Sequence, residues 1–166
     1  MRKVLTVALA IATSGAVAAL IAASQLSTEM KPAEHGWFTP TEIIWQDGPP
    51  SLPPGAKVAV LEGPPSKEGP VTFRLWMPDG YKVMPHWHPA VEHITVISGT
   101  FNLGMGDQFD KFRVGRTLPA GGFAFMPPKM NHFAFTSGDT VIQIHAIGPW
   151  QINYVNPADD PRQAKK

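Results

Sequence analysis

The feature that most constrains the fold of this chain is its division, from Thr41 onward, into short apolar runs separated by turn-forming residues. The separators are rich in proline and glycine and lie at 47–54, 63–70, 78–80, 127–129 and 148–149. The 166 residues include 18 prolines and 15 glycines, and no stretch after residue 40 keeps a helical hydrophobic period over three turns. This pattern argues against a helical bundle or a coiled coil and predicts an all-β domain of short strands.

The apolar runs predict one β-sandwich or barrel over residues 41–155, between a linker at 25–40 and a flexible tail at 156–166. Several runs alternate with a period of two, which is typical of a sheet with two unlike faces. On this basis the side chains expected to line the interior are Phe101, Leu103, Met105, Phe123 and Phe125. The expected strands are 42–46, 57–62, 71–77, 83–88, 92–98, 100–105, 122–126, 132–135, 140–147 and 151–155.

The N-terminus has the layout of a secretory signal. Arg2 and Lys3 precede an almost purely apolar segment at 4–23, and the next charge is Glu29. Small residues allow cleavage after Ala18 or after Ser24, and the later site is favoured because it leaves no apolar stub on the mature chain. The alternative is an uncleaved membrane anchor over 4–23. In either case residues 1–24 predict an exported domain, with the periplasm as its compartment.

Charge and cysteine content exclude several classes of function. The formal charge is +1, and without Arg2 and Lys3 it becomes 12 − 13 = −1, so no nucleic acid partner is expected. The chain has no cysteine, which excludes disulfides, thiolate metal sites and a cysteine nucleophile.

Three histidines and one glutamate form the pattern that carries chemistry. His86 and His88 are two residues apart in an expected strand, so their imidazoles project from one face about 6–7 Å apart. Glu92 can lie on the same side, and His132 opens a later strand. Such a set could hold a first-row divalent metal and leave coordination positions for substrate or water. An isolated His-x-His is more simply a pair of surface or hydrogen-bonded histidines. The choice between this interpretation and a metal site therefore depends on the spacing of the residues around the two histidines.

That spacing resembles the first conserved motif of the cupin superfamily, G(x)5HxH(x)3,4E(x)6G. The positions that match it are Gly80, His86, His88, Glu92 and Gly99. The second motif, G(x)5PxG(x)2H(x)3N, is matched by Gly121, Pro127 and His132, whereas Lys129 replaces its glycine and Thr136 its asparagine. In the family that glycine usually serves a turn and the asparagine is not a ligand, so the departures concern loop geometry more than metal binding.

The resemblance implies a double-stranded β-helix, or jelly-roll barrel, with a metal near one mouth. It implies His86, His88, Glu92 and His132 as the metal ligands. The metal itself is not named by the motif: Fe or Mn is preferred for a redox enzyme, and the same donors suit Zn, Ni, Co or Cu.

Three further polar residues lie close to the motif or to its strands. His93 follows Glu92 and should point to the opposite face. Gln143 and His145 share one face of the expected strand 140–147, with isoleucines on the other. If they point inward, they support the metal or bind substrate; if outward, they are ordinary surface residues.

Two classes of function follow from the resemblance. The first is a metal-dependent oxidoreductase of the dioxygenase type, acting on a small organic molecule outside the cytoplasm. The second is a non-catalytic module or sensor that binds a metal or a small ligand. A homodimer is also expected, because Trp150, Ile152 and Tyr154 give one apolar face that needs cover, although the chain's own strands could supply that cover.

Overall fold

The computed structural model describes residues 35–163, so the signal segment predicted at 1–24 lies outside the described residues. The described part is all-β, as predicted, and holds no α-helix. Its strands are β1 (Gln46–Asp47), β2 (Lys57–Glu62), β3 (Gly69–Met77), β4 (Lys82–Trp87), β5 (Glu92–Met105), β6 (Arg116–Pro119), β7 (Phe123–Met126), β8 (His132–Gly148) and β9 (Asn153–Tyr154). Three single-turn 3-10 helices complete it: η1 (Pro40–Glu42), η2 (Pro157–Asp159) and η3 (Pro161–Gln163). No helix within residues 35–163 has the length and apolarity to cross a membrane.

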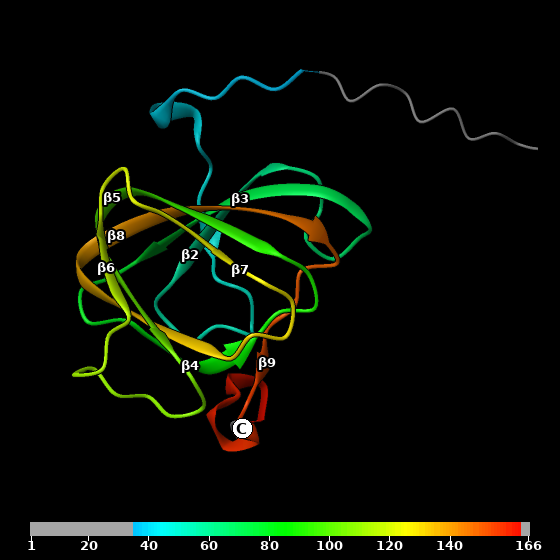
Figure 1. The fold of residues 1–166 in the computed structure, drawn as a ribbon. Coiled ribbons are helices and arrows are strands. Elements are labelled where there is room, and N and C mark those ends of the chain that lie inside the picture. Colours follow the sequence, from blue (N-terminus) through cyan, green and yellow to red (C-terminus); the bar gives the residue numbers. More distant parts are fainter. Residues whose placement is uncertain (1–34, 164–166) are drawn as a thin grey trace, which may run out of the picture. The chain divides into compact units, whose positions relative to one another are not determined.

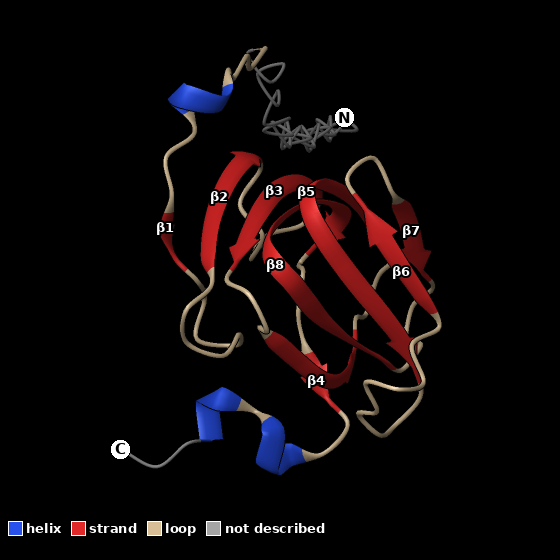
Figure 2. Ribbon diagram, turned by 90° about the vertical axis from the view of Figure 1, so that its left-hand side faces the viewer, coloured by secondary structure: helices blue, strands red, loops and turns tan. Residues whose placement is uncertain are grey.

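Two long strands, β5 and β8, organise the sheet. They pair antiparallel along most of their lengths, from Glu92 opposite Ala146 to Met105 opposite His132. On its other edge β8 pairs with β4 through its first half and with β3 through its second half. β5 pairs in the same way with β6 and β7. One antiparallel sheet therefore curls around an interior, as Figures 1 and 2 show.

In two places, two strands that the sequence predicts as separate form one continuous strand with a glycine at the junction. The runs 92–98 and 100–105 join into β5 through Gly99, where φ is +77° and the pairing with β8 shifts register. The runs 132–135 and 140–147 join into β8 through Gly138, where φ is +74°. One residue with positive φ bends a strand locally, and pairing with the neighbouring strand continues beyond it. Glycine adopts this conformation at little cost, so the strand does not end there.

Short or polar edge elements account for the other differences. β6 was missed because Leu118 is its one buried residue, so the segment shows no apolar alternation. The strand expected at 42–46 is wrong: η1 ends at Glu42, and β1 begins only at Gln46. η2 and η3 lie in the segment predicted as a tail, and Arg162 Nη2 donates to the Ile152 carbonyl oxygen at 3.0 Å.

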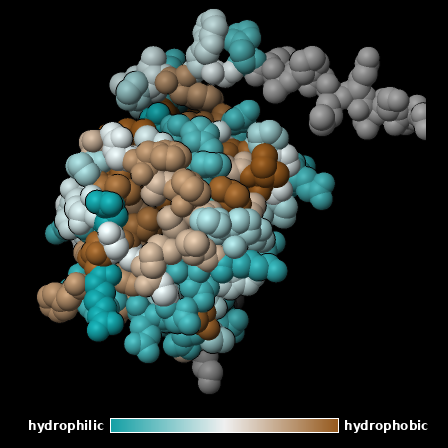
Figure 3. Space-filling model, in the orientation of Figure 1, coloured by the Kyte–Doolittle hydropathy of each residue, from teal (hydrophilic) through white to brown (hydrophobic). Residues whose placement is uncertain are grey.

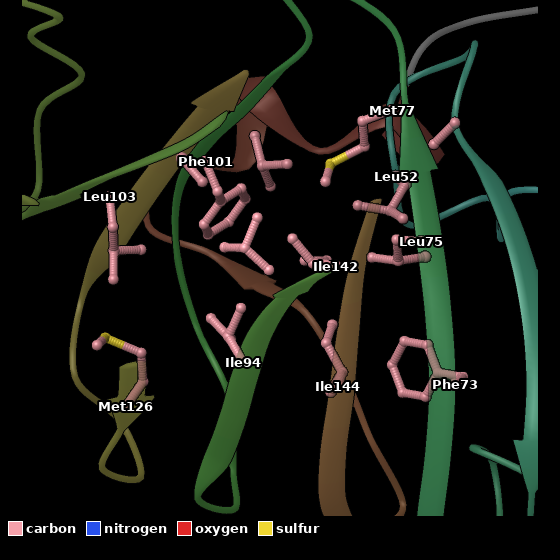
Figure 4. Packing of buried hydrophobic residues seen from close by; sticks show 14 of the residues in the cluster. Leu52, Phe73, Leu75, Met77, Ile94, Phe101, Leu103, Met126, Ile142 and Ile144 are labelled. Carbon is pink, nitrogen blue, oxygen red and sulfur yellow. The ribbon is translucent and has the colours of Figure 1, made fainter. Parts of the chain in front are cut away.

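The interior is filled by aliphatic and aromatic side chains from β3, β5 and β8 (Figure 4). Phe101 and Leu103 lie in it as predicted. The expectation for Met105, Phe123 and Phe125 is wrong, since their side chains are 46%, 56% and 57% exposed. The register explains the two phenylalanines. β7 pairs Met126 with buried Glu92 and Phe125 with exposed His93, so the odd-numbered residues of β7 face outward.

The alternating apolar residues of the segment 150–154 pack against the core of their own chain. Ile152 is buried in the core, and Trp150 and Tyr154 pack against it. β9 pairs with β4, which places Tyr154 opposite His86. The apolar face that suggested a partner is therefore covered within one chain, and the homodimer stays a prediction.

Candidate metal centre

The four predicted ligand residues come together inside the curled sheet. His86 lies near the end of β4, His88 directly after it, and Glu92 and His132 are the first residues of β5 and β8. Their exposed fractions are 5%, 2%, 3% and 2%. The register pairs His86 with His132, and their ring centroids are 4.3 Å apart. One ligand atom from each histidine lies within 4.8 Å of the others.

Backbone carbonyl groups fix the orientation of all three rings. Nδ1 of His86, His88 and His132 lies 2.7, 2.7 and 2.9 Å from the carbonyl oxygens of Met84, Gln151 and Met130. A carbonyl oxygen only accepts, so each Nδ1 carries a proton and donates it. In the neutral imidazoles the lone pair is therefore on Nε2, the tautomer that metal-ligating histidines adopt when their other nitrogen is held in this way.

Burial keeps two of these histidines in the form that binds metals. It lowers the pKa of His86 well below its ordinary value of 6.5, and the charges that His132 and His88 would carry lower it further. Burial also lowers the pKa of His132, against the opposing effect of the nearby Glu92 carboxylate. Neutral imidazoles can donate their lone pairs to a cation, whereas protonated ones cannot.

The glutamate is held by one oxygen and presents the other to the histidines. Trp150 Nε1 donates to Glu92 Oε1 at 3.0 Å. Glu92 Oε2 lies 3.3 Å from His88 Nε2 and 3.8 Å from His132 Nε2. The indole of Trp150 also stacks on His88, with ring centroids 5.1 Å apart and planes inclined by 21°. Trp150 therefore fixes one ligand by a hydrogen bond and covers another.

The donor set fits a metal ion. In the described part of the chain, His88 Nε2 is the buried side-chain nitrogen or oxygen without a hydrogen-bond partner. Its lone pair faces Glu92 Oε2, another acceptor, and such an arrangement is unfavourable unless a proton or cation lies between the two atoms. Three imidazoles and one carboxylate suit first-row divalent ions. The buried cluster could thus bind a metal ion, whose identity the donors leave open.

A small cavity adjoins the cluster. The space open to the centre of a water molecule is about 30 Å³, and its wall combines the four polar side chains with apolar residues such as Ile94, Phe101, Ile142 and Ile144. One water molecule needs roughly 10–15 Å³ by this measure, so the cavity accepts one or two waters or a ligand of similar size.

The structure places Gln143 and His145 on the outer face of β8, away from the cluster. Ile142 and Ile144 take the inner face, and side chains alternate along a strand. Gln143 accepts from Arg74 Nε at 2.9 Å, and His145 Nδ1 lies 3.1 Å from Thr72 Oγ1. Both side chains therefore point outward, and neither lines the cavity beside the predicted ligands. His93 is exposed, as expected, and stacks against Phe123.

The two departures from the second motif keep its geometry by other means. Lys129 adopts the left-handed conformation, with φ of 62°, and its amide donates to the His88 carbonyl oxygen at 2.9 Å. Thr136 is buried, where its hydroxyl donates to the Pro78 carbonyl oxygen and accepts from the Tyr81 amide at 2.9 Å. The turn before His132 therefore forms without its glycine.

Trp150 is the site residue that sequence reasoning missed. It lies beyond both motifs, and its one sequence signal, alternation with Ile152 and Tyr154, indicates packing and not a contact with Glu92. Its backbone amide also donates to the Pro65 carbonyl oxygen at 2.7 Å, which holds the segment after β8 against the loop between β2 and β3.

The curled sheet and its buried cluster of three histidines and one glutamate define a cupin fold. Residues 34–151 match the family described as the ChrR cupin-like domain, and the chain belongs to that family. No match was found among curated proteins.

Solved structures with the same fold include three bacterial proteins. The polyketide cyclase RemF from Streptomyces resistomycificus is 16% identical, with a TM-score of 0.60 over 78% of this chain and 92% of its own. A protein from Methylibium petroleiphilum, provisionally named an acetylacetone dioxygenase, is 17% identical, with a TM-score of 0.60 over 77% and 85%. An RmlC-like cupin from Shewanella frigidimarina is 20% identical, with a TM-score of 0.54 over 69% and 91%. At these identities the likeness establishes the fold and not the activity.

Proposed function

We propose that this protein is a metal-dependent oxidoreductase of the dioxygenase type that acts on a small organic molecule. The observation that carries the proposal is the grouping of His86, His88 and His132, whose ligand atoms lie within 4.8 Å of one another beside Glu92 Oε2, at the wall of an apolar cavity. Four protein donors leave part of the coordination sphere of a first-row ion for other ligands. When bound, such an ion would supply Lewis acidity and a one-electron redox couple.

Fe or Mn is the metal we propose, because both ions are redox-active and accept mixed imidazole and carboxylate donors. The same donors accept Zn, Ni, Co or Cu, so supply in the cell also selects the ion. The chain's own residues would hold the ion, keep His86 and His132 neutral through burial, and exclude bulk water with the apolar wall. The partner is then a small-molecule substrate.

The test combines metal analysis with oxygen uptake. Protein purified without chelators should contain a first-row metal, and forms loaded with Fe(II), Mn(II) and Zn(II) should be screened in parallel on small phenols, diketones and thiols. We expect Glu92→Gln to retain part of the metal and lose most turnover, because it removes the one anionic ligand while keeping size and a weak oxygen donor. His145→Ala on the outer face is the matched control and should keep both.

The second candidate, a non-catalytic binding module, is favoured by the size of the cavity. About 30 Å³ admits water-sized ligands but no organic substrate unless the wall opens. If no metal form of the wild type consumes oxygen with any substrate, while metal still raises its melting temperature, the oxidoreductase proposal fails and the binding module replaces it.

A further inference from the structure

A second, larger cavity is lined by residues of β2, of β3 and of the segment that follows β8. It is about 220 Å³, measured in the same way as the metal cavity, and we call it the outer pocket. Its wall includes Pro49, Val58, Val60, Pro65, Phe73 and Trp150, and only Ser51 and Ser66 contribute side-chain hydroxyls to it. The metal cavity also has Trp150 in its wall, so this one residue borders both spaces.

The indole is held in place by contacts on several sides. One contact is the stack on His88, and Phe73 packs edge-on at a centroid distance of 4.9 Å. The Nε1–H group donates to Glu92, and the backbone amide donates to Pro65, itself part of the outer pocket. A molecule in the outer pocket would therefore touch the residue that stacks on one predicted metal ligand and hydrogen-bonds another.

The two volumes assign different ligands to the two spaces. The metal cavity has room for one or two water-sized molecules, whereas an apolar cavity of roughly 150 Å³ is enough to bind benzene. The outer pocket exceeds that size and offers few polar groups, so a compact apolar molecule fits it and a charged or strongly polar one does not.

We infer that the outer pocket binds a compact and largely apolar molecule about the size of one aromatic ring, and that Trp150, which borders both spaces, links this ligand site to the metal centre. The inference does not depend on the proposed oxidoreductase function. The binding site itself rests on the pocket and on the contacts of Trp150.

Fluorobenzene, observed by 19F NMR, is the probe that tests the binding site. We expect saturable binding to the wild-type protein, loaded with Zn(II) to keep the site diamagnetic. Val60→Trp and Ser66→Trp should each weaken binding by about tenfold or more, since both place an indole in the pocket from an exposed position. Ile97→Trp is the matched control, because Ile97 is also a half-exposed aliphatic strand residue, outside the pocket wall, and should leave binding unchanged.

Replacing Zn(II) by paramagnetic Co(II) tests the position of the bound probe. Relaxation by a paramagnetic ion falls steeply with distance, so fluorobenzene bound beside Trp150 should relax faster in the Co(II) form than in the Zn(II) form. Absence of saturable binding, equal binding in the pocket variants, or equal loss in Ile97→Trp would overturn the inference. Binding that follows the pocket variants supports the ligand site independently of oxygen uptake, so this inference and the proposed function can fail separately.

Discussion

At the scale of single residues, the metal centre depends on which nitrogen of each histidine is free. The sequence motif identifies the residues but not their tautomers, which are set by the carbonyl groups of Met84, Gln151 and Met130. These contacts are made by backbone atoms, so no side-chain pattern encodes them. Trp150 could not be predicted as a site residue for a different reason: its indole contact with Glu92 joins segments far apart in the chain.

Acid should destabilise the metal-free protein through these histidines. The pKa values of His86 and His132 are lower in the folded state than the ordinary 6.5, so the unfolded chain binds more protons below that pH. The free energy of unfolding should therefore change little because of these groups above about pH 7 and fall as the pH drops through 6.5. Urea denaturation of chelator-treated protein at pH 5 to 8 measures this slope, and a stability that rises toward pH 5 would contradict it.

Lys129 carries a conformational cost that can be measured. Its φ of 62° lies in a region that costs a non-glycine residue roughly 1–2 kcal/mol, partly offset by the greater freedom that glycine has in the unfolded chain. Because the side chain is exposed, we expect Lys129→Gly to raise the free energy of unfolding by about 0.5 kcal/mol. Lys129→Val should lower it by about 1 kcal/mol, since a β-branched residue fits this region worse. Urea melts measure whether the free energy of unfolding decreases from Lys129→Gly through the wild type to Lys129→Val. The reverse order would show that the turn is unstrained.

At the scale of elements, the sequence predicted which strands exist better than where they end. β2 has the predicted bounds, because its apolar run is flanked by proline and glycine on both sides. The breaks expected inside β5 and β8 do not occur, and β6 was missed, because pairing with a long neighbour sustains a strand through a glycine or a polar stretch. The predicted side-chain directions on β7 are wrong for a related reason: register with β5, and not hydrophobicity, determines which residues of β7 face outward.

The bend in β5 requires glycine more strictly than the bend in β8. A Cβ atom at Gly99 would lie 2.3 Å from the Asp139 carbonyl oxygen, whereas one at Gly138 would meet nothing within 4 Å. Both residues have positive φ, so alanine pays the left-handed cost of roughly 1–2 kcal/mol at either position. Gly99→Ala should cost a further 1–3 kcal/mol or so, because the strands must separate to relieve the overlap. Equal losses in urea melts of the two variants would show that the close approach is not limiting.

At the scale of the whole molecule, the all-β cupin domain follows from the pattern of turns and from the motif, and the structure confirms it.

Two properties stay predictions from sequence. For export, the mature protein should begin near Gln25 by mass spectrometry, and a detergent-extracted chain beginning at Met1 would indicate the anchor instead. For the homodimer, sedimentation at tens of micromolar protein is the measurement. Ile97 of β5 and Phe123 and Phe125 of β7 are exposed hydrophobic side chains. Figure 3 shows apolar areas on the face of the molecule turned to the viewer.

A metal should stabilise the entire barrel, because its four ligands come from three separate parts of the curled sheet. His86 and His88 lie at the end of β4, and Glu92 and His132 begin β5 and β8, so an ion bound to all four ties together strands distant in sequence. Binding to the folded state alone adds about 2.7 kcal/mol to the free energy of unfolding when the free metal is 100 times its Kd. For a domain of this size, that corresponds to a rise in melting temperature of roughly 5–15 °C.

Glu92→Gln should show a smaller rise at the same Zn(II) concentration, because the neutral amide binds the cation less strongly. His145→Ala removes a histidine from the outer face and should show the wild-type rise. Calorimetry of the three proteins with and without Zn(II) makes the comparison. A rise abolished by His145→Ala, or unchanged in Glu92→Gln, would mean that the metal binds outside the buried cluster. In the metal-free protein, His88 Nε2 has no hydrogen-bond partner and lies 3.3 Å from Glu92 Oε2. An ion bound by both atoms would remove this unfavourable contact from the folded state, and the gain would add to the free energy of unfolding of the whole domain.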